Sequence, residues 1–379
     1  MTAQPGIDLV RTLLRQVGGE APSPARTGEV PALHYTSQER FAAERAALFA
    51  RLPVLVAHAS ELAEPGACLT VDVAGVPLLV VRGADGEIRA FRNACRHRAT
   101  RLVTADAPCR KKAIVCPYHG WTYDLSGTRV HVPHLPTFRG TEASRDALVP
   151  AHAAVRHGLV WVSLAPFDAA RHLAPIDEEL GAIGMADAVV YARRAHEVRG
   201  NWKLIVDAFL DGYHIRHLHR DTVYRFFVDA LSEAQPAGDH IRAASARRTL
   251  LTAQNVRLED VDLRALATPS YVLFPSTVLI LHPDYTSVLT LTPEAPDRTT
   301  FVHTMLVPQA PRSAEEEKHW AKSFSLIDEG VFVREDLATV EAMQRGMTAG
   351  ADETLLFGEL EQAALWFHES IERAVCERG

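Results

Sequence analysis

The sequence predicts an α+β protein with two domains, in which a small all-β domain is followed by a larger domain whose helices cover an antiparallel sheet. Its 379 residues exceed the usual size of one domain and can form two sizeable cores. Between residues 53 and 166, short apolar runs alternate with turn residues, as in strands. After residue 166, strand patterns mix with longer helical periods. We therefore expect a helical segment over 1–52, a β domain over 53–166 and an α+β domain over 167–379.

The N-terminal segment contains an expected helix over residues 37–52. Phe41, Leu48 and Leu52 recur on one side of this helix, although Arg45 interrupts the apolar stripe. A helix with one apolar side buries that side, and we expect it to pack on the larger domain. In the β domain that follows, turn signals such as Ala74-Gly75 separate the expected strands.

In the larger domain, three consecutive strands are expected over residues 271–280, 286–291 and 300–307, and two helices over 314–344 and 355–375. Consecutive strands joined by short turns form an antiparallel sheet. A sheet covered by a long helix leaves a cavity, and cavities of this kind bind small molecules.

Composition excludes several classes of function. The net charge is −7 and the basic residues are scattered, so nothing indicates binding to nucleic acid. No apolar run is long enough to cross a membrane, and the N-terminus has no secretory signal. We expect a protein without nucleic-acid or membrane partners.

Two short elements, Cys95-Arg-His97 and Cys116-Pro-Tyr-His119, supply two thiols and two imidazoles. A 2Fe-2S cluster can be held with cysteines on one iron and histidines on the other, which raises its potential. A structural zinc is the alternative, since two Cys and two His also form a tetrahedral site. Zinc modules usually place a Cys pair before a His pair, whereas each element here has one of each. The pattern favours the redox cluster.

Three further cysteines, Cys68, Cys109 and Cys376, are dispersed along the chain. An odd, scattered set is a poor disulfide framework, so the cytoplasm is the expected compartment. Although Cys109 lies between the two motifs, we interpret it as a bystander because the motifs already supply four ligands.

A second group of metal-binding residue types lies in the middle of the chain. On a regular helix Asp207, Asp211 and His214 share one face, so Asp211 can accept a hydrogen bond from the His214 ring. Two histidines and one carboxylate form the facial triad that binds ferrous iron in oxygenases. Helix geometry pairs His214 with His217, because residues five apart, such as His214 and His219, point about 140° from each other.

The carboxylate of such a triad must come from elsewhere, and residues 332–344 offer the best candidate. On a helix Asp336 lies between Phe332 and Val340 and above Met343, which places a charge on an apolar face. A charge in that position needs a partner. The neighbouring Glu335 is the alternative, as a solvated or hydrogen-bonded residue.

The first pair of motifs, Cys95-Arg-His97-Arg with Cys116-Pro-Tyr-His119-Gly-Trp121, resembles the Rieske motif of the Rieske non-haem iron oxygenases. The loop between the two motifs is slightly longer than is usual in that family, which loop-closure entropy tolerates. Respiratory Rieske proteins are also similar here, but they carry an additional cysteine pair where this chain has Thr100 and Tyr118.

The central segment also resembles that family, because Asn201-Trp202-Lys203 is followed by Asp211-x2-His214-x4-His219. The resemblance implies that His219, and not His217, is the second histidine ligand, and that the helix is broken or widened between the two ligands. It also implies that Asp336, rather than Glu335, is the third ligand of a mononuclear iron. We expect Asp207 and His217 to have ordinary structural roles.

The resemblance extends from the helix near Ser37 to Phe367-His368 and implies the fold and the partners. A Rieske domain would precede a helix-grip (START-like, SRPBCC) catalytic domain in the catalytic alpha component of the homotrimeric monooxygenase or demethylase type. A separate NAD(P)H-dependent reductase, with or without a ferredoxin, would supply electrons. Asp211 would bridge His214 and a cluster histidine of the neighbouring subunit, His119. Dioxygen would then be used to hydroxylate or demethylate a small organic substrate.

The residues leave one functional alternative of another class, a Rieske electron carrier fused to a small-molecule binding module without oxygenase activity. The sequence contains no flavin or nicotinamide fingerprint, so an electron source on another polypeptide is expected in both cases. The residues expected to line the cavity, from Leu273 to Leu291, are apolar and do not identify the substrate.

Overall fold

The computed structural model describes residues 4–105, 108–138, 146–253, 256–350 and 353–378. The chain divides into two compact units. One unit is continuous, from Phe49 to His172. The other combines Met1–Leu48 with Leu173–Gly379. Within the described residues, no helix has the length and apolar character needed to cross a lipid bilayer.

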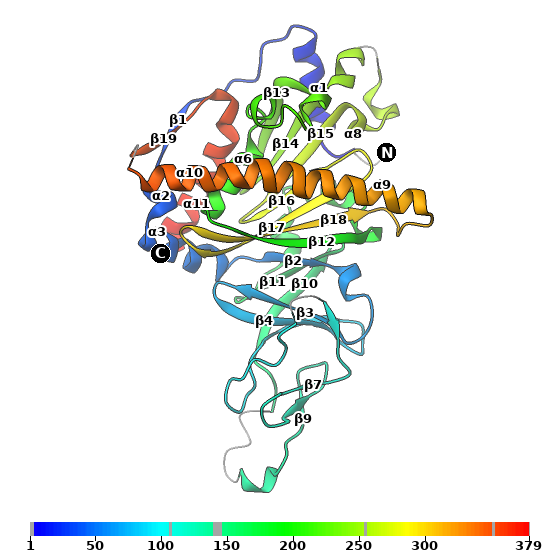
Figure 1. The fold of residues 1–379 in the computed structure, drawn as a ribbon, viewed down its shortest axis with the longest axis vertical. Coiled ribbons are helices and arrows are strands. Elements are labelled where there is room, and N and C mark those ends of the chain that lie inside the picture. The colour runs from blue at the N-terminus through cyan, green and yellow to red at the C-terminus, as the bar shows by residue number, and fades with distance from the viewer. Residues whose placement is uncertain (1–3, 106–107, 139–145, 254–255, 351–352, 379) are drawn as a thin grey trace. The chain divides into compact units, whose positions relative to one another are not determined.

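The continuous unit is built from antiparallel strands (Figure 1). A seven-stranded sheet has the order β2-β11-β10-β5-β4-β3-β6, and a smaller sheet has the order β7-β8-β9. Alternating and continuous apolar runs bury the central strands, so that residues 78–81 of β4 are fully inaccessible. The strands are β2 (Val54–His58), β3 (Ala67–Val73), β4 (Val76–Arg82), β5 (Ile88–Arg92), β6 (Cys109–Arg110), β7 (Ile114–Val115), β8 (Thr122–Tyr123), β9 (Arg129–His131), β10 (Pro150–Arg156) and β11 (Leu159–Ser163).

The second unit contains a seven-stranded antiparallel sheet with the order β12-β18-β17-β16-β15-β14-β13. The expected antiparallel sheet is therefore confirmed. The expected single strand over 271–280 is wrong, because a turn at 274–276 divides it into two paired strands. The strands are β12 (Val189–Val198), β13 (Phe227–Ala237), β14 (His240–Arg247), β15 (Ala267–Leu273), β16 (Thr277–Leu281), β17 (Thr286–Ala295) and β18 (Arg298–Val307).

A long helix crosses one face of this sheet, from α9 (Ala314–Ser325) through a π-helical stretch, η8 (Leu326–Leu337), to α10 (Ala338–Thr348) (Figure 1). A π-helix has hydrogen bonds between residues five apart and often occurs at functional sites. The three segments follow one another directly and so form one continuous helix. The other helices of the unit are α1 (Ile7–Val17), α2 (Leu33–Thr36), α3 (Gln38–Glu44), α5 (Asp177–Ala182), α6 (Trp202–Leu210), α7 (Ile215–Leu218), α8 (Leu263–Leu266) and α11 (Gln362–Arg378), and α4 (Ala169–Leu173) lies at the boundary of the two units.

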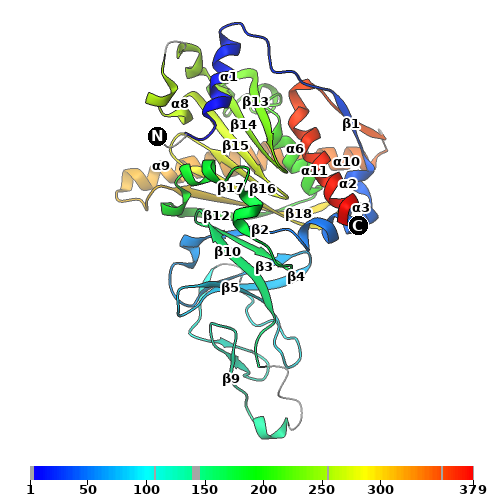
Figure 2. The same ribbon diagram turned by 180° about the vertical axis from the view of Figure 1, so that it is seen from behind.

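The N-terminal residues pack into this second unit at two places. Leu9, Val10 and Leu13 of α1 join the apolar core formed by residues of β14, β15 and α8 (Figure 2). The strand β1 (Gly28–Pro31) pairs with β19 (Thr354–Phe357). The expected helix over 355–375 therefore begins later, at Gln362, because the residues before it form this strand.

The start of α6 is fixed by three consecutive residues, Asn201-Trp202-Lys203. The Asn201 side chain accepts a hydrogen bond from the backbone N–H of Lys203 at 3.0 Å, which caps the helix. Trp202 and Lys203 donate to the buried Glu44 carboxylate of α3, at 3.1 and 2.7 Å. These contacts join α3 to α6 and so hold in place the helix that leads to Asp211.

Candidate functional site

The first cysteine motif forms a tight loop over residues 95–100. The backbone N–H of Cys95 donates to the carbonyl of Thr100 at 2.8 Å, and that of Ala99 donates to the carbonyl of Cys95 at 2.9 Å. Ala99 closes the loop in the left-handed region, with a φ of 57°. The Cys95 thiol is buried beneath the loop, 3.4 Å from the hydroxyl of Tyr123.

The second motif repeats this geometry. The backbone N–H of Cys116 donates to the carbonyl of Trp121 at 2.8 Å, and that of Gly120 donates to the carbonyl of Cys116 at 3.0 Å. Gly120 has a φ of 70° and corresponds to Ala99 of the first loop. The two loops are therefore structurally equivalent, each with a buried cysteine at its base.

The histidines of the two loops lie beside each other. The ring centroids of His97 and His119 are 4.7 Å apart, and His97 stacks on Trp121 at 5.0 Å. Among the described residues, no group can hydrogen-bond the buried Nδ1 of His119, and a metal ion would satisfy it. Burial, with a contribution from the neighbouring Cys116, raises the pKa of the Cys95 thiol. Two adjacent thiols and two adjacent imidazoles form a donor set that fits a 2Fe-2S cluster.

The second site begins where α6 ends. Asp211 is extended, with φ −118° and ψ 141°, and its Oδ1 accepts hydrogen bonds from the backbone N–H groups of Tyr213 and His214 at 2.6 and 3.0 Å. Because these two N–H groups bond to the Asp211 side chain, they cannot form the backbone hydrogen bonds that would continue α6. The break lies before His214, so the expected continuous face from Asp207 to His214 is wrong, as is the expected break between His214 and His219. A regular helical turn, α7, separates those two histidines.

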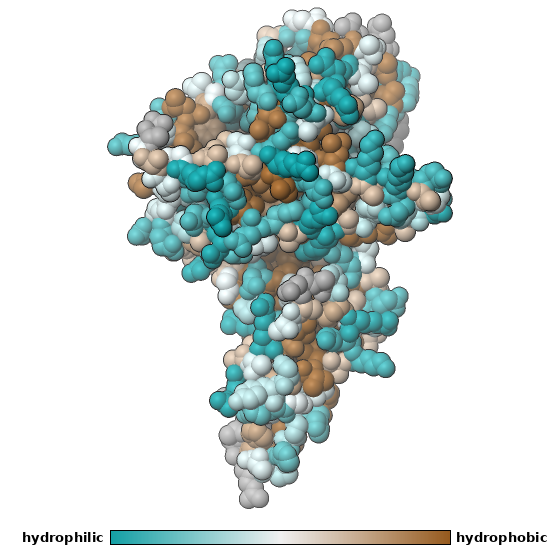
Figure 3. Space-filling view, in the orientation of Figure 1, coloured by the Kyte–Doolittle hydropathy of each residue, from teal (hydrophilic) through white to brown (hydrophobic). Residues whose placement is uncertain are grey.

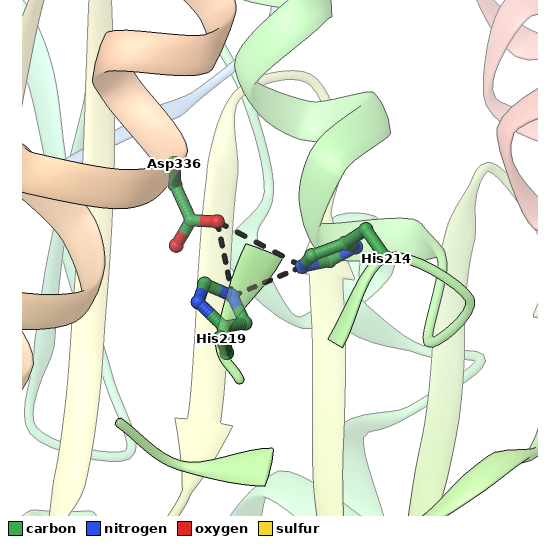
Figure 4. Close-up of side chains that lie close together, drawn as sticks. All are labelled: His214, His219 and Asp336. Atoms are coloured by element: carbon green, nitrogen blue, oxygen red, sulfur yellow. Dashed lines mark hydrogen bonds and ion pairs between the residues drawn. The ribbon is translucent and has the colours of Figure 1, made fainter. Parts of the chain in front are cut away.

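Three side chains from two segments converge at this point (Figure 4). Nε2 of His214 and Nε2 of His219 are 3.1 Å apart. Oδ1 of Asp336 lies 3.2 Å from Nε2 of His219 and 3.7 Å from Nε2 of His214. Octahedral iron, with ligands at about 2.1 Å and right angles between them, separates neighbouring donor atoms by about 3 Å. The three donor atoms therefore fit one face of such an ion.

Asp336 is almost inaccessible, at 3% exposure, and within the described part of the chain its Oδ1 has no hydrogen-bond donor. A buried carboxylate oxygen without a donor is costly unless a cation neutralises it. The apolar surroundings expected from Phe332 and Val340 are present, since both are buried. Met343 is 46% exposed and therefore does not contribute to this buried apolar surface as expected.

Glu335 contacts the opposite side of the same histidine. Its Oε2 lies 2.6 Å from Nδ1 of His219 and accepts a hydrogen bond from Thr222 at 2.8 Å. Burial disfavours a charged His219, but the carboxylates of Asp336 and Glu335 outweigh that effect and raise its pKa. The same negative potential favours a metal cation at Nε2.

A cavity of about 220 Å³ opens beside these three side chains and is lined by residues of α6, η8 and the sheet. Its wall is largely apolar. Arg247 is the one Arg or Lys side chain among the described residues of this wall, and its guanidinium lies 3.3 Å from the hydroxyl of Thr268. Five aromatic side chains contribute to the wall: Phe209, Phe226, Phe227, Tyr285 and Phe332.

Asp211 lies between this cavity and a second hollow of about 390 Å³, and it lines both. Its Oδ2 is 3.3 Å from Nδ1 of His214. Apolar residues of α10 and β19 form much of the second hollow, and Leu356 of β19 is 74% exposed. Figure 3 shows hydrophobic and hydrophilic side chains mixed over this face of the second unit. Asp207 and Glu361 also line it, and burial, followed by the charges of Asp211 and Asp207, raises the pKa of Glu361.

Other residues of the central segment have structural positions. Asp207 accepts a hydrogen bond from Tyr35 at 2.8 Å and lies 3.0 Å from Nε2 of His368. His217 is exposed and lies outside the group of metal-binding side chains. Sequence reasoning missed Glu361 and Arg247, because no local spacing relates Glu361 to Asp211 or Arg247 to the cavity wall.

Comparison with known proteins identifies both units. Residues 53–148 match the model of the Rieske [2Fe-2S] domain, and residues 185–377 match that of the ring hydroxylating alpha subunit (catalytic domain). The first match decides between the iron-sulfur cluster and zinc in favour of the cluster. The second excludes a mere electron carrier, and the expected oxygenase class and fold class are confirmed.

Individual relatives agree with this assignment. The carnitine monooxygenase oxygenase subunit of Escherichia coli (strain K12) is 27% identical over 338 residues, which is 86% of each chain. The glycine betaine monooxygenase oxygenase subunit of Chromohalobacter salexigens is 32% identical over 261 residues, 67% of this chain and 54% of the relative.

A solved quaternary ammonium Rieske monooxygenase, whose structure is described as giving insight into carnitine oxidation and inter-subunit electron transfer in that protein, shares the fold. It has a TM-score of 0.78 and 21% identity, and the likeness covers 98% of this chain and 99% of the other. The chain therefore belongs to the ring hydroxylating alpha subunits, as the Rieske oxygenase component that binds a 2Fe-2S cluster and a mononuclear iron.

Proposed function

We propose that His214, His219 and Asp336 hold the mononuclear iron and that Cys95, His97, Cys116 and His119 hold the 2Fe-2S cluster. The convergence of two Nε2 atoms and a buried carboxylate oxygen, for which the described residues offer no hydrogen-bond donor, is the observation that carries the first assignment. The paired loops with buried thiols and adjacent imidazoles support the second. We assign the cluster to a domain over 53–166, and the iron to 167–379 together with the packed segment 1–52.

Within the catalytic unit, the protein's own residues prepare the reaction. When bound, the iron supplies the activation of dioxygen beside the substrate. The three ligands occupy one side of the metal position, and the cavity provides room for the substrate. Aromatic walls exclude water and fix the orientation of the substrate. Glu335 fixes the ring of His219 through Nδ1.

Asp211 is the proposed bridge for electron transfer between subunits of a homotrimer. It contacts Nδ1 of His214 on one side and lines the second hollow on the other. That hollow combines apolar residues with the acidic groups Asp207 and Glu361, a surface suited to the exposed side of a histidine-bearing loop. The cluster histidine His119 of a neighbouring subunit would occupy it.

Electrons come from a separate NAD(P)H-dependent reductase, with or without a ferredoxin, and the protein works in the cytoplasm. The cysteines of the described chain are free thiols, as expected in a reducing compartment.

The product is a hydroxylated or demethylated small organic compound. Carnitine and glycine betaine, for which two relatives are named, both carry a carboxylate. Arg247 in the cavity wall can bind such a group, and we propose a small organic anion as substrate.

The decisive experiment combines metal analysis with oxygen uptake. Purified protein should contain iron and acid-labile sulfide, and should consume oxygen with a surrogate reductase when a substrate is present. Asp336→Ala should remove the mononuclear iron and the substrate-dependent uptake but leave the cluster spectrum unchanged. Oxygen uptake that persists in Asp336→Ala would contradict the ligand assignment.

A further inference from the structure

A continuous series of hydrogen-bonding contacts leads away from the wall of the catalytic cavity. Nε2 of His282, a cavity residue, lies 3.1 Å from Oγ of Ser287, which in turn lies 3.0 Å from Nε2 of His303. Nδ1 of His303 lies 3.1 Å from the Asp328 carboxylate. That carboxylate lies 3.1 Å from Nε2 of His196. Five side chains thus form one unbroken path.

The path crosses the sheet beneath η8. It starts after β16 and passes through Ser287 of β17 and His303 of β18 to His196 of β12, the edge strand. Ser287, His303 and Asp328 are completely inaccessible to solvent, whereas the side chain of His196 is 20% exposed. Arg194, which is 43% exposed, also binds Asp328, at 3.0 Å. One end of the path therefore meets the cavity and the other meets solvent.

The oxygenase reaction creates a need for such a path. In monooxygenation, one substrate C–H bond and one dioxygen molecule take up two electrons and two protons and give one alcohol and one water. The reductase supplies the electrons. The protons must reach a cavity with largely apolar walls, where free water is a poor source.

We propose that His196, Asp328, His303, Ser287 and His282 form a proton relay from solvent to the catalytic cavity. The inference rests on the proposed oxygenase function. Each imidazole and the serine hydroxyl can accept a proton on one side and release one on the other, so one proton enters at His196 as one leaves His282. Asp328 takes the proton from Nε2 of His196 and passes it to Nδ1 of His303, so its carboxylate is anionic at rest and protonated only during the transfer.

The charges around the relay agree with this role. Burial lowers the pKa of His282 to about 3, with further contributions from His303, Arg247 and Arg264. Burial also lowers the pKa of His303, despite the Asp328 carboxylate beside it. Both rings are thus neutral at rest, and a proton that reaches His282 is readily passed to an acceptor in the cavity.

The surrounding side chains hold the two rings without adding charge. Tyr285 stacks on His282 with the ring centroids 4.2 Å apart. Phe324 stacks on His303 at 4.9 Å, and Phe332 meets its edge at 5.0 Å. Among the described residues, the charged groups near the path include the cations Arg194, Arg247 and Arg264, and Glu329, which pairs with Arg194 at 2.7 Å. These cations disfavour a resting imidazolium and so keep both histidines ready to accept a proton.

The alternative is that the same contacts only satisfy buried polar groups. Ser287→Ala separates the two possibilities, because it removes one hydroxyl from the middle of the path and leaves both rings. Ser287→Thr keeps a hydroxyl there. Ser276→Ala is the matched control: Ser276 is 3% exposed, adjoins the same sheet and donates to the carbonyl of Leu291 at 3.1 Å, but lies outside the path.

Reconstituted holoenzyme with a surrogate reductase would be assayed for product with L-carnitine, glycine betaine and benzoate as probes. We expect Ser287→Ala to form product about 100-fold more slowly at pH 8, the scale of a lost proton transfer. Its rate should recover as the pH is lowered to 6.5, because hydronium then enters from the cavity mouth. Ser287→Thr and Ser276→Ala should retain the wild-type rate and pH profile, and probe affinity by calorimetry should not change.

A rate and pH profile of Ser287→Ala equal to those of Ser276→Ala would overturn the relay. So would a loss of rate that is independent of pH and of solvent deuteration. Absence of oxygen uptake in wild type with every probe would instead count against the proposed function. In that case ¹⁵N spectra of the histidines in the metal-free protein test the path directly: Ser287→Ala should shift Nε2 of both His282 and His303, and an unchanged spectrum would refute it.

Discussion

The carboxylate of Glu335 lies 2.6 Å from Nδ1 of His219, on the ring nitrogen opposite the one that faces Asp336. Two carboxylates adjacent in the sequence thus contact the two nitrogens of one imidazole. The hydrogen bond at Nδ1 fixes the tautomer and leaves Nε2 available as a metal ligand. In the proposed site, Asp336 therefore binds the metal and Glu335 orients the His219 ring.

Glu335→Gln should weaken iron binding without abolishing it. The amide keeps a hydrogen bond to Nδ1 but removes the charge that makes the ring a strong ligand, and changes of this kind lower metal affinity about 10- to 100-fold. Iron titration of the apoprotein measures the effect. Thr222→Val, which removes only the hydroxyl that binds Glu335, should have a smaller effect. Equal affinity in wild type and Glu335→Gln would contradict the orienting role.

Asp211→Asn should stop electron transfer to the mononuclear iron while both metal centres remain. The amide preserves the shape and loses the charge beside His214. We expect full iron content and normal reduction of the cluster by the reductase, but oxygen uptake near background. His217→Gln is the control, since His217 is exposed in the same segment.

A mixed-subunit experiment tests whether the transfer crosses a subunit boundary. Asp211→Asn subunits would be co-expressed with subunits that lack the cluster through Cys116→Ser. Neither subunit can work by itself. Transfer between subunits would restore part of the activity, because an intact cluster can then serve the intact Asp211 of its neighbour. Mixtures as inactive as each variant alone would show transfer within one subunit.

The residues that the sequence offered as metal ligands do lie together in the structure, and their role as ligands stays a proposal. Cys95, His97, Cys116 and His119 lie within short loops, so their spacing reflects the geometry of one local structure. Helix periodicity alone gave His217 as the partner of His214 and was misleading. His214 and His219 lie at the two ends of the short helix α7, whereas His217 lies within it, and periodicity alone does not predict where so short a helix ends.

Contacts between distant segments were beyond the reach of sequence patterns. In the core, the Glu44 carboxylate binds both Trp202 and Lys203, although Glu44 and Trp202 are 158 residues apart in the sequence. The relay from His282 to His196 depends on the pairing register of β12, β17 and β18. The π-helical winding of η8 likewise decides which residues flank Asp336.

Lys203→Met should destabilise the protein strongly. The ammonium of Lys203 and the carboxylate of Glu44 are both fully buried and 2.7 Å apart. Loss of one partner leaves a buried charge poorly compensated, which costs about 3 kcal/mol. Thermal unfolding should show a lower midpoint for Lys203→Met and partial recovery in the double variant with Glu44→Gln. A midpoint equal to wild type would show that Arg40 alone satisfies Glu44.

Arg247→Gln should weaken the binding of anionic ligands and leave the binding of neutral ligands unchanged. A hydrogen bond to a charged group contributes about 1.5 to 3 kcal/mol, so a carboxylate probe should bind about 10- to 100-fold more weakly. Benzoate and benzamide form a matched pair for calorimetry, because they differ in charge and little in shape. Benzamide affinity should be the same in both proteins. A loss shared equally by the two probes would indicate a collapsed cavity and not an anion site.

Thiol reactivity should distinguish the cysteines of the holoprotein. Cys68 and Cys109 face each other across β3 and β6 with their Sγ atoms 3.0 Å apart. Burial, followed by the hydrogen bond to Cys109, raises the pKa of Cys68 to about 12. Only thiolates react with iodoacetamide, so Cys68 should stay unmodified at pH 8 while the exposed Cys376 is alkylated quickly. Mass spectrometry of tryptic peptides measures both sites.

Cys109→Ala should leave Cys68 slow to react, because burial is the larger cause of its raised pKa. Rapid labelling of Cys68 in that variant would show that the hydrogen bond dominates instead.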